Sequence, residues 1–201
     1  MKYIAFDIET TGTVAGVDRI VEIGAVCFEN GQPVSRFSTL VNPKIPIPAG
    51  ASRVNGITDD MVKDQPTIDQ VLPSFAEFCA DVVMVAHNSA FDTQFITSDV
   101  KIFEAPAPRG TIIDTLSISR KVFPGLLNYK LETLVNHLCI PKGQFHRAEA
   151  DAICCGHLFG HILQKVSNPV SIENLIALTG RPEQKFPQII PQPKQLSLLD
   201  I

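Results

Sequence analysis

The 201-residue chain has no apolar run that approaches the ~18 residues needed to span a bilayer, so we expect no membrane partner. Its first segment lacks a basic stretch leading into a long apolar core, which argues against a signal peptide. Five cysteines lie in apolar contexts without the paired spacing typical of zinc sites or disulfide frameworks. We therefore expect a cytoplasmic protein whose thiols are reduced and buried.

Positive charge is also scarce. The chain has 17 Lys and Arg against 21 Asp and Glu, a formal net charge of −4. This balance argues against a protein that coats nucleic acid through a broad basic surface. It does not exclude an enzyme that holds a few nucleotides through metal ions and backbone amides, because divalent cations offset acidic charge at the site itself.

The most informative feature present is a strand that ends in two acidic residues. Side chains alternate along a strand, so Asp7 and Glu9 share one face, while Ile4, Phe6 and Ile8 share the other and can enter a core. Two like charges this close are unfavourable unless a cation or a proton joins them. A hard divalent metal, which prefers carboxylate oxygen ligands, is the expected partner.

The strand pattern predicts a mixed sheet. Asn30-Gly31 separates strand-like runs at 21–28 and 34–41, which is a strong hairpin signal, and with the first strand this predicts three antiparallel strands. Apolar runs at 82–86 and 111–114, each followed by a helical pattern, predict further strands connected by helices. The sequence therefore indicates an α/β fold in which helices flank a mixed sheet.

The remaining segments set the expected organisation of the chain. Helices are expected after residue 58, at 68–78, from about 92 to 102, before Pro124, and at 130–138, 147–165 and 171–178. The segment with Pro43, Pro46 and Pro48 is expected to be a loop, and Pro73 to kink its helix or mark its start. Four prolines between 181 and 194 predict an extended, mobile tail. We thus expect a domain at 1–167, a helical extension at 168–180 and a Pro-rich tail at 181–201.

Three further residues fall where they can join the two acids. Asp92 follows a predicted strand, and His146 and Asp151 lie at the start of the last long helix. Four carboxylates supply enough oxygen ligands for two Mg²⁺ or Mn²⁺ ions, a pair that hydrolyses phosphodiesters, and His146 would be the general base. Taken singly, each residue could instead be an ordinary surface group. For Asp114 we favour a structural role at a strand end.

Three segments resemble the DEDDh family of 3′–5′ exonucleases, and within it the epsilon-type proofreading subunits of bacterial replicative polymerases. They are Phe6–Gly12, His87–Asp92 and His146–Asp151, in that order, within a resemblance that covers about residues 1–165. The resemblance implies a ribonuclease H-like fold, two metal ions held by the four carboxylates, and activation of water by His146.

The resemblance also implies a set of substrate contacts. The backbone around the first motif would hold the terminal nucleotide, and two residues of the second motif would line the cleft: Ile8, Thr10, Thr11 and Gly12, then Asn88 and Phe91. Asn55 stands where epsilon-like members commonly carry a histidine that meets the substrate. Asn55 can still donate and accept hydrogen bonds, so we count it among the expected contacts.

The C-terminal peptide resembles the short segments by which bacterial replication proteins bind the sliding clamp. Its expected anchors are Gln195, Leu196, Leu198 and Leu199. An extended peptide of this kind docks apolar side chains into a preformed groove. The alternative is that the leucines pack back onto the domain.

These features predict a metal-dependent 3′–5′ exodeoxyribonuclease that releases nucleoside 5′-monophosphates from single-stranded or frayed DNA 3′ ends. It would act in proofreading or repair, alone or as a polymerase subunit. A 3′–5′ exoribonuclease or oligoribonuclease is one alternative, because the 2′-OH alone distinguishes the substrates. A nonhydrolytic adaptor for clamp or polymerase is another, although the complete set of candidate catalytic residues argues against it.

Overall fold

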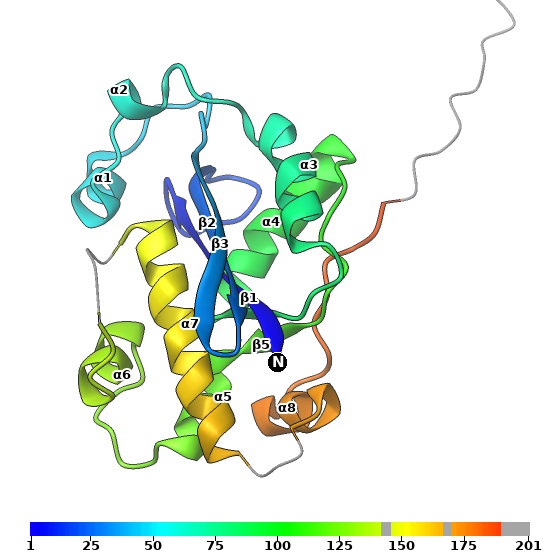
Figure 1. Ribbon diagram of the computed structural model, residues 1–201. Coiled ribbons are helices and arrows are strands. Elements are labelled where there is room, and N and C mark those ends of the chain that lie inside the picture. The colour runs from blue at the N-terminus through cyan, green and yellow to red at the C-terminus, as the bar shows by residue number, and fades with distance from the viewer. Residues whose placement is uncertain (142–145, 167–169, 190–201) are drawn as a thin grey trace, which may run out of the picture.

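A five-stranded mixed sheet forms the centre of the molecule (Figure 1). The computed structural model describes residues 1–141, 146–166 and 170–189. The strands are β1 (Lys2–Thr10), β2 (Ile20–Glu29), β3 (Gln32–Leu40), β4 (Met84–Ala86) and β5 (Ile112–Asp114), in the spatial order β3-β2-β1-β4-β5. The first three strands are antiparallel, and β4 and β5 run parallel to β1. The predicted ribonuclease H-like sheet is confirmed.

The β2–β3 turn is the one that the sequence predicts. Asn30 and Gly31 both have positive φ, at 52° and 78°. A two-residue hairpin turn of this kind matches the right-handed twist of the strands it joins. The turn pairs β3 with β2, and β2 in turn pairs with β1 at the centre of the sheet.

Helices cover the two faces of the sheet with separate apolar clusters. On one face, α3 (Ile68–Cys79) and α4 (Ala90–Phe103) pack against alternate side chains of β1. On the other lie α5 (Thr115–Val122), α6 (Leu131–His137), α7 (Ala148–Lys165) and α8 (Ile172–Thr179) (Figure 1). The predicted inner stripe of α7 is fully buried: Ala148, Ala152, Cys155, Phe159 and Ile162. No helix in the described part of the chain is both long and apolar enough to cross a bilayer.

The Pro-rich segment after β3 is a loop up to Pro48, as expected, but a helix that the sequence analysis did not predict follows it. This helix, α1 (Ala49–Asn55), begins directly after Pro48, and the short helix α2 (Asp59–Val62), expected after residue 58, comes next. Proline is tolerated at a helix start because the N–H groups of the first turn have no intrahelical acceptor, so a proline there loses no hydrogen bond. Pro73 lies inside α3, which begins earlier at a Thr67–Gln70 capping box and continues to Cys79.

The segment after α8 also differs from expectation. Residues 181–189 form no helix, and they pack on the domain instead of leaving it as a mobile tail. Gln184 pairs with Ile112 at the edge of β5, and Phe186 is buried in the α3–α4 cluster. The free energy of burying Phe186 and of pairing Gln184 outweighs the extended preference that the prolines confer. The boundary at residue 167 and the tail beyond 189 stay predictions.

The expectation for the cysteines is correct at four positions and wrong at one. Cys27, Cys79, Cys154 and Cys155 are buried, whereas Cys139 is exposed. Cys139 has a positive φ of 53° and directly follows the last residues of α6. Its place in the turn after the helix explains why its side chain is outside the core.

Candidate active site

Strand periodicity directs the two acids of β1 away from the α3–α4 cluster. The even-numbered residues of this segment are buried in that cluster, as predicted: Ile4, Phe6 and Ile8. Asp7 and Glu9 consequently project toward the face that α7 covers. The first two candidate ligands are therefore fixed by the same alternation that builds the core.

The start of α7 approaches β2 closely at Gly24, which lies opposite Asp7 in the β1–β2 register. A Cβ atom on Gly24 would lie 2.2 Å from the backbone nitrogen of Glu149 and 2.3 Å from the carbonyl carbon of Ala148. Only glycine allows the helix backbone to lie this close to the strand. Asp151, in the first turn of α7, is thereby placed over the face that carries Asp7.

Glu22 anchors the same end of α7. Its side chain is 3% exposed, and Oε1 lies 2.6 Å from Nη2 of Arg147. The Nε–H of Arg147 and the backbone N–H of Ala148 also donate to this carboxylate. The sequence analysis missed this role. The available signal was a charged residue within an apolar strand, which needs a partner when it is buried.

His146 and Asp151 are held together by the backbone. The N–H of His146 donates to Oδ2 of Asp151 at 2.9 Å, and His146 adopts a φ of 62°, in the left-handed region. Oδ1 of Asp151 is buried and accepts no hydrogen bond from the described residues. One potential ligand atom from each of Glu9, His146 and Asp151 lies within 4.8 Å of the others. Three of the five predicted catalytic residues thus converge.

Asp92 joins the site from α4. Its side chain is 2% exposed, and its Oδ1 accepts the backbone N–H of Ile8 at 3.2 Å. Ile8 lies between Asp7 and Glu9 in β1, so this bond ties the first turn of α4 to the strand that carries both acids. Ile8, predicted as a substrate contact, uses its N–H for this tie, and its side chain is buried in the core.

Burial raises the pKa of every one of these four carboxyl groups. The pKa of Asp92 rises to about 8, that of Glu9 to about 7 and that of Asp151 to about 6. The pKa of Asp7 is also raised well above its usual range, by burial first and then by the charges of Asp92, Asp151 and Glu9. Without a cation, the cluster therefore retains protons at neutral pH.

The donor set fits hard divalent cations. A bound cation would neutralise the four carboxyl groups whose pKa values are raised. It would also give a partner to Oδ1 of Asp151, which has none among the described residues. Such ligands bind metal in the deprotonated form, so binding would replace protons that burial now retains.

Of the predicted contacts, Thr10 ends β1, and Thr11 and Gly12 begin a loop that closes on itself. Thr11 is 3% exposed, and its Oγ1 accepts the backbone N–H of Arg19. The carboxylate of Asp18 lies over Gly12, where a Cβ atom would come within 2.4 Å of it. The loop is thus preorganised beside the acids, and its contact with a nucleotide stays a prediction.

Asn55 has a supporting role in the structure. It is 3% exposed, its Nδ2 donates to the carbonyl of Thr10 at 3.3 Å, and its Oδ1 accepts the N–H of Ile57 at 3.0 Å. A side-chain hydrogen bond from Asn55 also opposes the rise in the pKa of Glu9. Asn55 therefore fixes the end of β1 beside the site, and the direct substrate contact expected from the sequence stays a prediction.

Asn88 and Phe91 flank the start of α4. Asn88 is exposed with a φ of 66°, and Phe91 is half-buried with its ring 5.1 Å from that of Phe95. The carboxylate of Asp114 accepts the N–H groups of Asn88 and Ser89, and also caps α5. The structural role favoured for Asp114 is confirmed. The four clamp-peptide residues, Gln195, Leu196, Leu198 and Leu199, lie outside the described residues.

A family model described as Exonuclease matches residues 4–159, which include all five candidate catalytic residues. The chain belongs to this exonuclease family. It is 36% identical to the DNA polymerase III subunit epsilon of Treponema pallidum, over 88% of this chain and 87% of that protein. It is 42% identical to the PolC-type DNA polymerase III of Caldanaerobacter subterraneus, over 82% of this chain. The chain spans only 12% of the length of that PolC-type relative.

Solved structures of exonucleases have the same fold. Exonuclease X in complex with 5′ overhanging duplex DNA is 30% identical with a TM-score of 0.72, over 89% of this chain and 99% of that one. Escherichia coli exonuclease I in complex with a dT13 oligonucleotide is 17% identical with a TM-score of 0.71, over 82% of this chain and 41% of that one. The second likeness establishes the fold alone. The first supports membership of the exonuclease family.

Proposed function

We propose that this protein is a metal-dependent 3′–5′ exodeoxyribonuclease that releases nucleoside 5′-monophosphates from DNA ends. The observation that carries the proposal is the cluster of Glu9, His146 and Asp151, together with the bond that ties Asp92 to the strand bearing Asp7 and Glu9, in a chain of the exonuclease family. The same residues argue against a nonhydrolytic adaptor, which has no need of several carboxyl groups gathered at a cost in desolvation.

In this proposal the four carboxylates hold two Mg²⁺ or Mn²⁺ ions. When bound, two such ions help to generate the attacking oxygen nucleophile and stabilise the departing oxygen of the phosphodiester. Oδ1 of Asp151 has no other partner among the described residues, which supports its role as a ligand. The hydrogen bond from the Ile8 N–H to Oδ1 of Asp92 would orient the Asp92 carboxylate, which is the ligand that α4 supplies.

His146 would accept the proton of the attacking water. Its side chain is exposed, so solvent can exchange the proton away, and its backbone bond to Asp151 holds it at the edge of the cluster. A histidine suits this step because its ordinary pKa lies near neutrality. The loop at Thr10–Gly12 and the pair Asn88 and Phe91 would position the terminal nucleotide.

DNA is the proposed substrate class, at single-stranded or frayed 3′ ends, in proofreading or repair. The names of the relatives support it: a polymerase III epsilon subunit, PolC-type polymerases, and an exonuclease bound to DNA. They also support work beside a polymerase subunit, and hence a cytoplasmic location. A clamp contact through Gln195–Leu199 is proposed from the sequence pattern alone. Deleting residues 195–201 should abolish clamp binding in a titration, and unchanged affinity would refute that part.

The function is tested by comparing matched DNA and RNA single strands in Mg²⁺, in Mn²⁺ and in chelator. We expect monophosphate release from DNA 3′ ends that depends on metal and is slower on RNA. Preference for RNA would favour the exoribonuclease alternative. An absence of metal-dependent hydrolysis on any 3′ end would favour the adaptor.

A further inference from the structure

A hollow of about 450 Å³ lies beside the start of α4 on the side of α5 and α6. Its walls include Asn88, Arg120, Asn128, Tyr129 and Lys130, and none of its lining residues is acidic. In a chain with a net negative charge, a hollow lined by two cations and no carboxylate is a local reversal of sign. Such a surface attracts anions.

The walls of this hollow are held in place by hydrogen bonds. His87, one of the lining residues, connects two of the walls. Its Nδ1 lies 3.0 Å from Oγ1 of Thr115, and its Nε2 lies 2.8 Å from the carbonyl oxygen of Tyr129. The hydroxyl of Tyr129 in turn donates to the carbonyl of Phe123 at 2.9 Å. The segment before α6 is therefore fixed to the ends of β4 and α5, so the hollow exists without a ligand.

The polar groups that face the hollow are mostly donors without partners. The exposed side chains of Arg120 and Lys130 make no ion pair or hydrogen bond within the described part of the chain. The Oδ1 of Asn128 already accepts from the Lys130 N–H and the Thr133 hydroxyl, which leaves its Nδ2 group to donate. Two cations and an amide donor are the groups that bind phosphate.

The hollow adjoins the acidic site on two sides. Asn88 lies next to Ser89, the N-cap of the helix whose first turn carries Asp92. Leu131, another wall residue, begins α6, which packs against α7, the helix that carries Asp151. A strand whose terminal phosphodiester lies at the acids would therefore pass this hollow with its neighbouring phosphates.

We propose that the hollow at Arg120 and Lys130 is a subsite for the backbone phosphates of the substrate strand next to the scissile one. The inference rests on the proposed nuclease function. It explains why the rate would depend on the length of the substrate strand. Cations along a groove that tracks the backbone are the usual way of holding single strands without reading their sequence.

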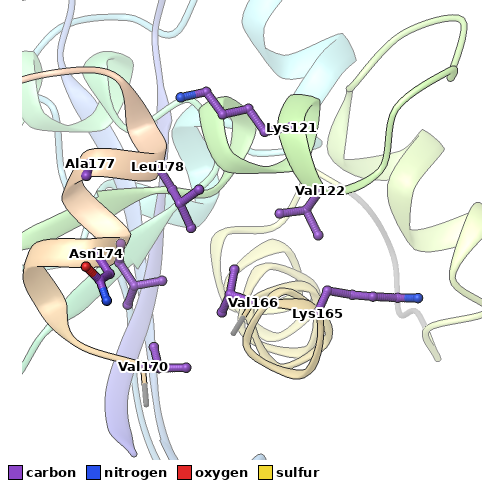
Figure 2. Close-up of a pocket in the computed structure, with 9 residues that line it drawn as sticks. Lys121, Val122, Lys165, Val166, Val170, Asn174, Ala177 and Leu178 are labelled. Carbon is purple, nitrogen blue, oxygen red and sulfur yellow. The ribbon is translucent and has the colours of Figure 1, made fainter. Parts of the chain in front are cut away.

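A larger hollow provides the contrast and the control. It measures about 640 Å³ and lies between α5, α8 and the C-terminal end of α7 (Figure 2). Its lining is mainly aliphatic, with Lys121 and Lys165 at the edges (Figure 2). Lys165 is 14 residues beyond Asp151 in α7, about 21 Å along the helix axis. Lys121, although next to Arg120 in sequence, turns toward α8, where its Nζ lies 3.4 Å from the position of a Cβ on Gly180. These two lysines therefore serve as control cations outside the proposed subsite.

The test compares Arg120→Gln, Lys130→Gln and their double variant with the controls Lys121→Gln and Lys165→Gln. Each is assayed on single-stranded oligothymidylate of about eight nucleotides and on thymidine 5′-p-nitrophenyl phosphate, an ester with no neighbouring phosphate. We expect the double variant to lose about tenfold or more in kcat/KM on the oligonucleotide, mainly through KM. Its rate on the ester should stay within about twofold of wild type.

Salt dependence gives an independent readout. The plot of log kcat/KM against log salt for the oligonucleotide should become shallower by about 1.4 in the double variant, as two phosphate contacts are lost. Both controls should keep the wild-type slope. An unchanged slope and KM in the double variant would refute the subsite. So would an equal loss on the ester, which would indicate a merely structural role. If the wild type hydrolyses neither substrate, the nuclease function itself fails.

Discussion

Glu22 of β2 and Arg147 at the start of α7 are joined across 125 residues of sequence by a multiply hydrogen-bonded ion pair in which the carboxylate is buried and the guanidinium partly exposed. This pair, together with the close contact at Gly24, decides where Asp151 and His146 lie relative to the acids of β1. The geometry of the candidate site therefore depends on three residues that are not themselves metal ligands: Glu22, Gly24 and Arg147.

Replacing Glu22 by Gln should destabilise the protein and reduce activity, because the amide cannot satisfy both the guanidinium and the Ala148 N–H. We expect a loss of about 2 kcal/mol in the free energy of unfolding, measured by urea titration. The matched control is Arg36→Gln, which breaks an exposed ion pair with Glu149 on the same helix turn. It should cost less than about 0.5 kcal/mol. Equal effects of the two variants would refute the anchoring role of Glu22.

Gly24→Ala should push the start of α7 away from β2, since the new methyl group has no room beside Ala148 and Glu149. We expect a loss of stability of roughly 2 kcal/mol or more and a larger relative loss in kcat than in substrate affinity. Gly50→Ala is the control, because a Cβ there meets no atom closer than 4.0 Å. A fully active and stable Gly24→Ala variant would show that the contact does not position Asp151.

The metal-free protein should lose stability as pH rises from 6.5 to 8. The folded pKa of Glu9 is about 7 and that of Asp92 about 8, both raised by burial above their ordinary values of 4.5 and 3.8. The folded state thus binds more protons than the unfolded state in this window, and its advantage disappears as those protons leave. His87, whose pKa burial lowers, contributes the opposite trend only below about pH 6.5.

Thermal unfolding in chelator at several pH values measures this effect. The melting temperature should fall by about 5 °C across the window, and Mg²⁺ should recover most at the upper end, where the carboxyl groups are deprotonated. Asp92→Asn should show a weaker trend. A melting temperature that rises with pH in chelator would contradict the assignment of buried, protonated acids.

Gln184 should stabilise the helix that carries Asp92. Its Oε1 accepts the hydroxyl of Ser89 at 2.8 Å, and its Nε2 donates to Oγ1 of Thr93 at 2.6 Å. Gln184→Ala is expected to cost about 1–2 kcal/mol and to speed hydrogen exchange in the first turns of α4. Lys185→Ala, which removes only an exposed ion pair with Glu183, is the control. Identical exchange in α4 for both variants would show that the segment does not support the site.

Local patterns predicted much of this fold. The alternation around Asp7 and Glu9 fixed their shared face, Asn30-Gly31 marked the hairpin, and the stripe of α7 marked its buried side. Each of these signals arises from residues within a few positions of one another. This is why the shared face of the acids, the hairpin and the helix bearing Asp151 could all be anticipated.

Features that depend on distant contacts were missed. The role of Glu22 depends on Arg147, and the docking of residues 181–189 depends on β5 and α4. Asn55 was expected to meet substrate, but its burial against Thr10 becomes visible only once α1 is placed. A composition that favours an extended chain gives no information about what that chain packs against.

The account is tested most directly by single-stranded DNA carrying distinct labels at its two ends, with Asp7→Asn beside wild type and Asp69→Asn as an exposed carboxylate control. The 3′ label should be released first, as a nucleoside 5′-monophosphate, only with Mg²⁺ or Mn²⁺. Asp7→Asn should be slower by at least about a thousandfold while staying folded, and Asp69→Asn should match wild type. Release of the 5′ label first, or an Asp7→Asn variant that retains activity, would contradict it.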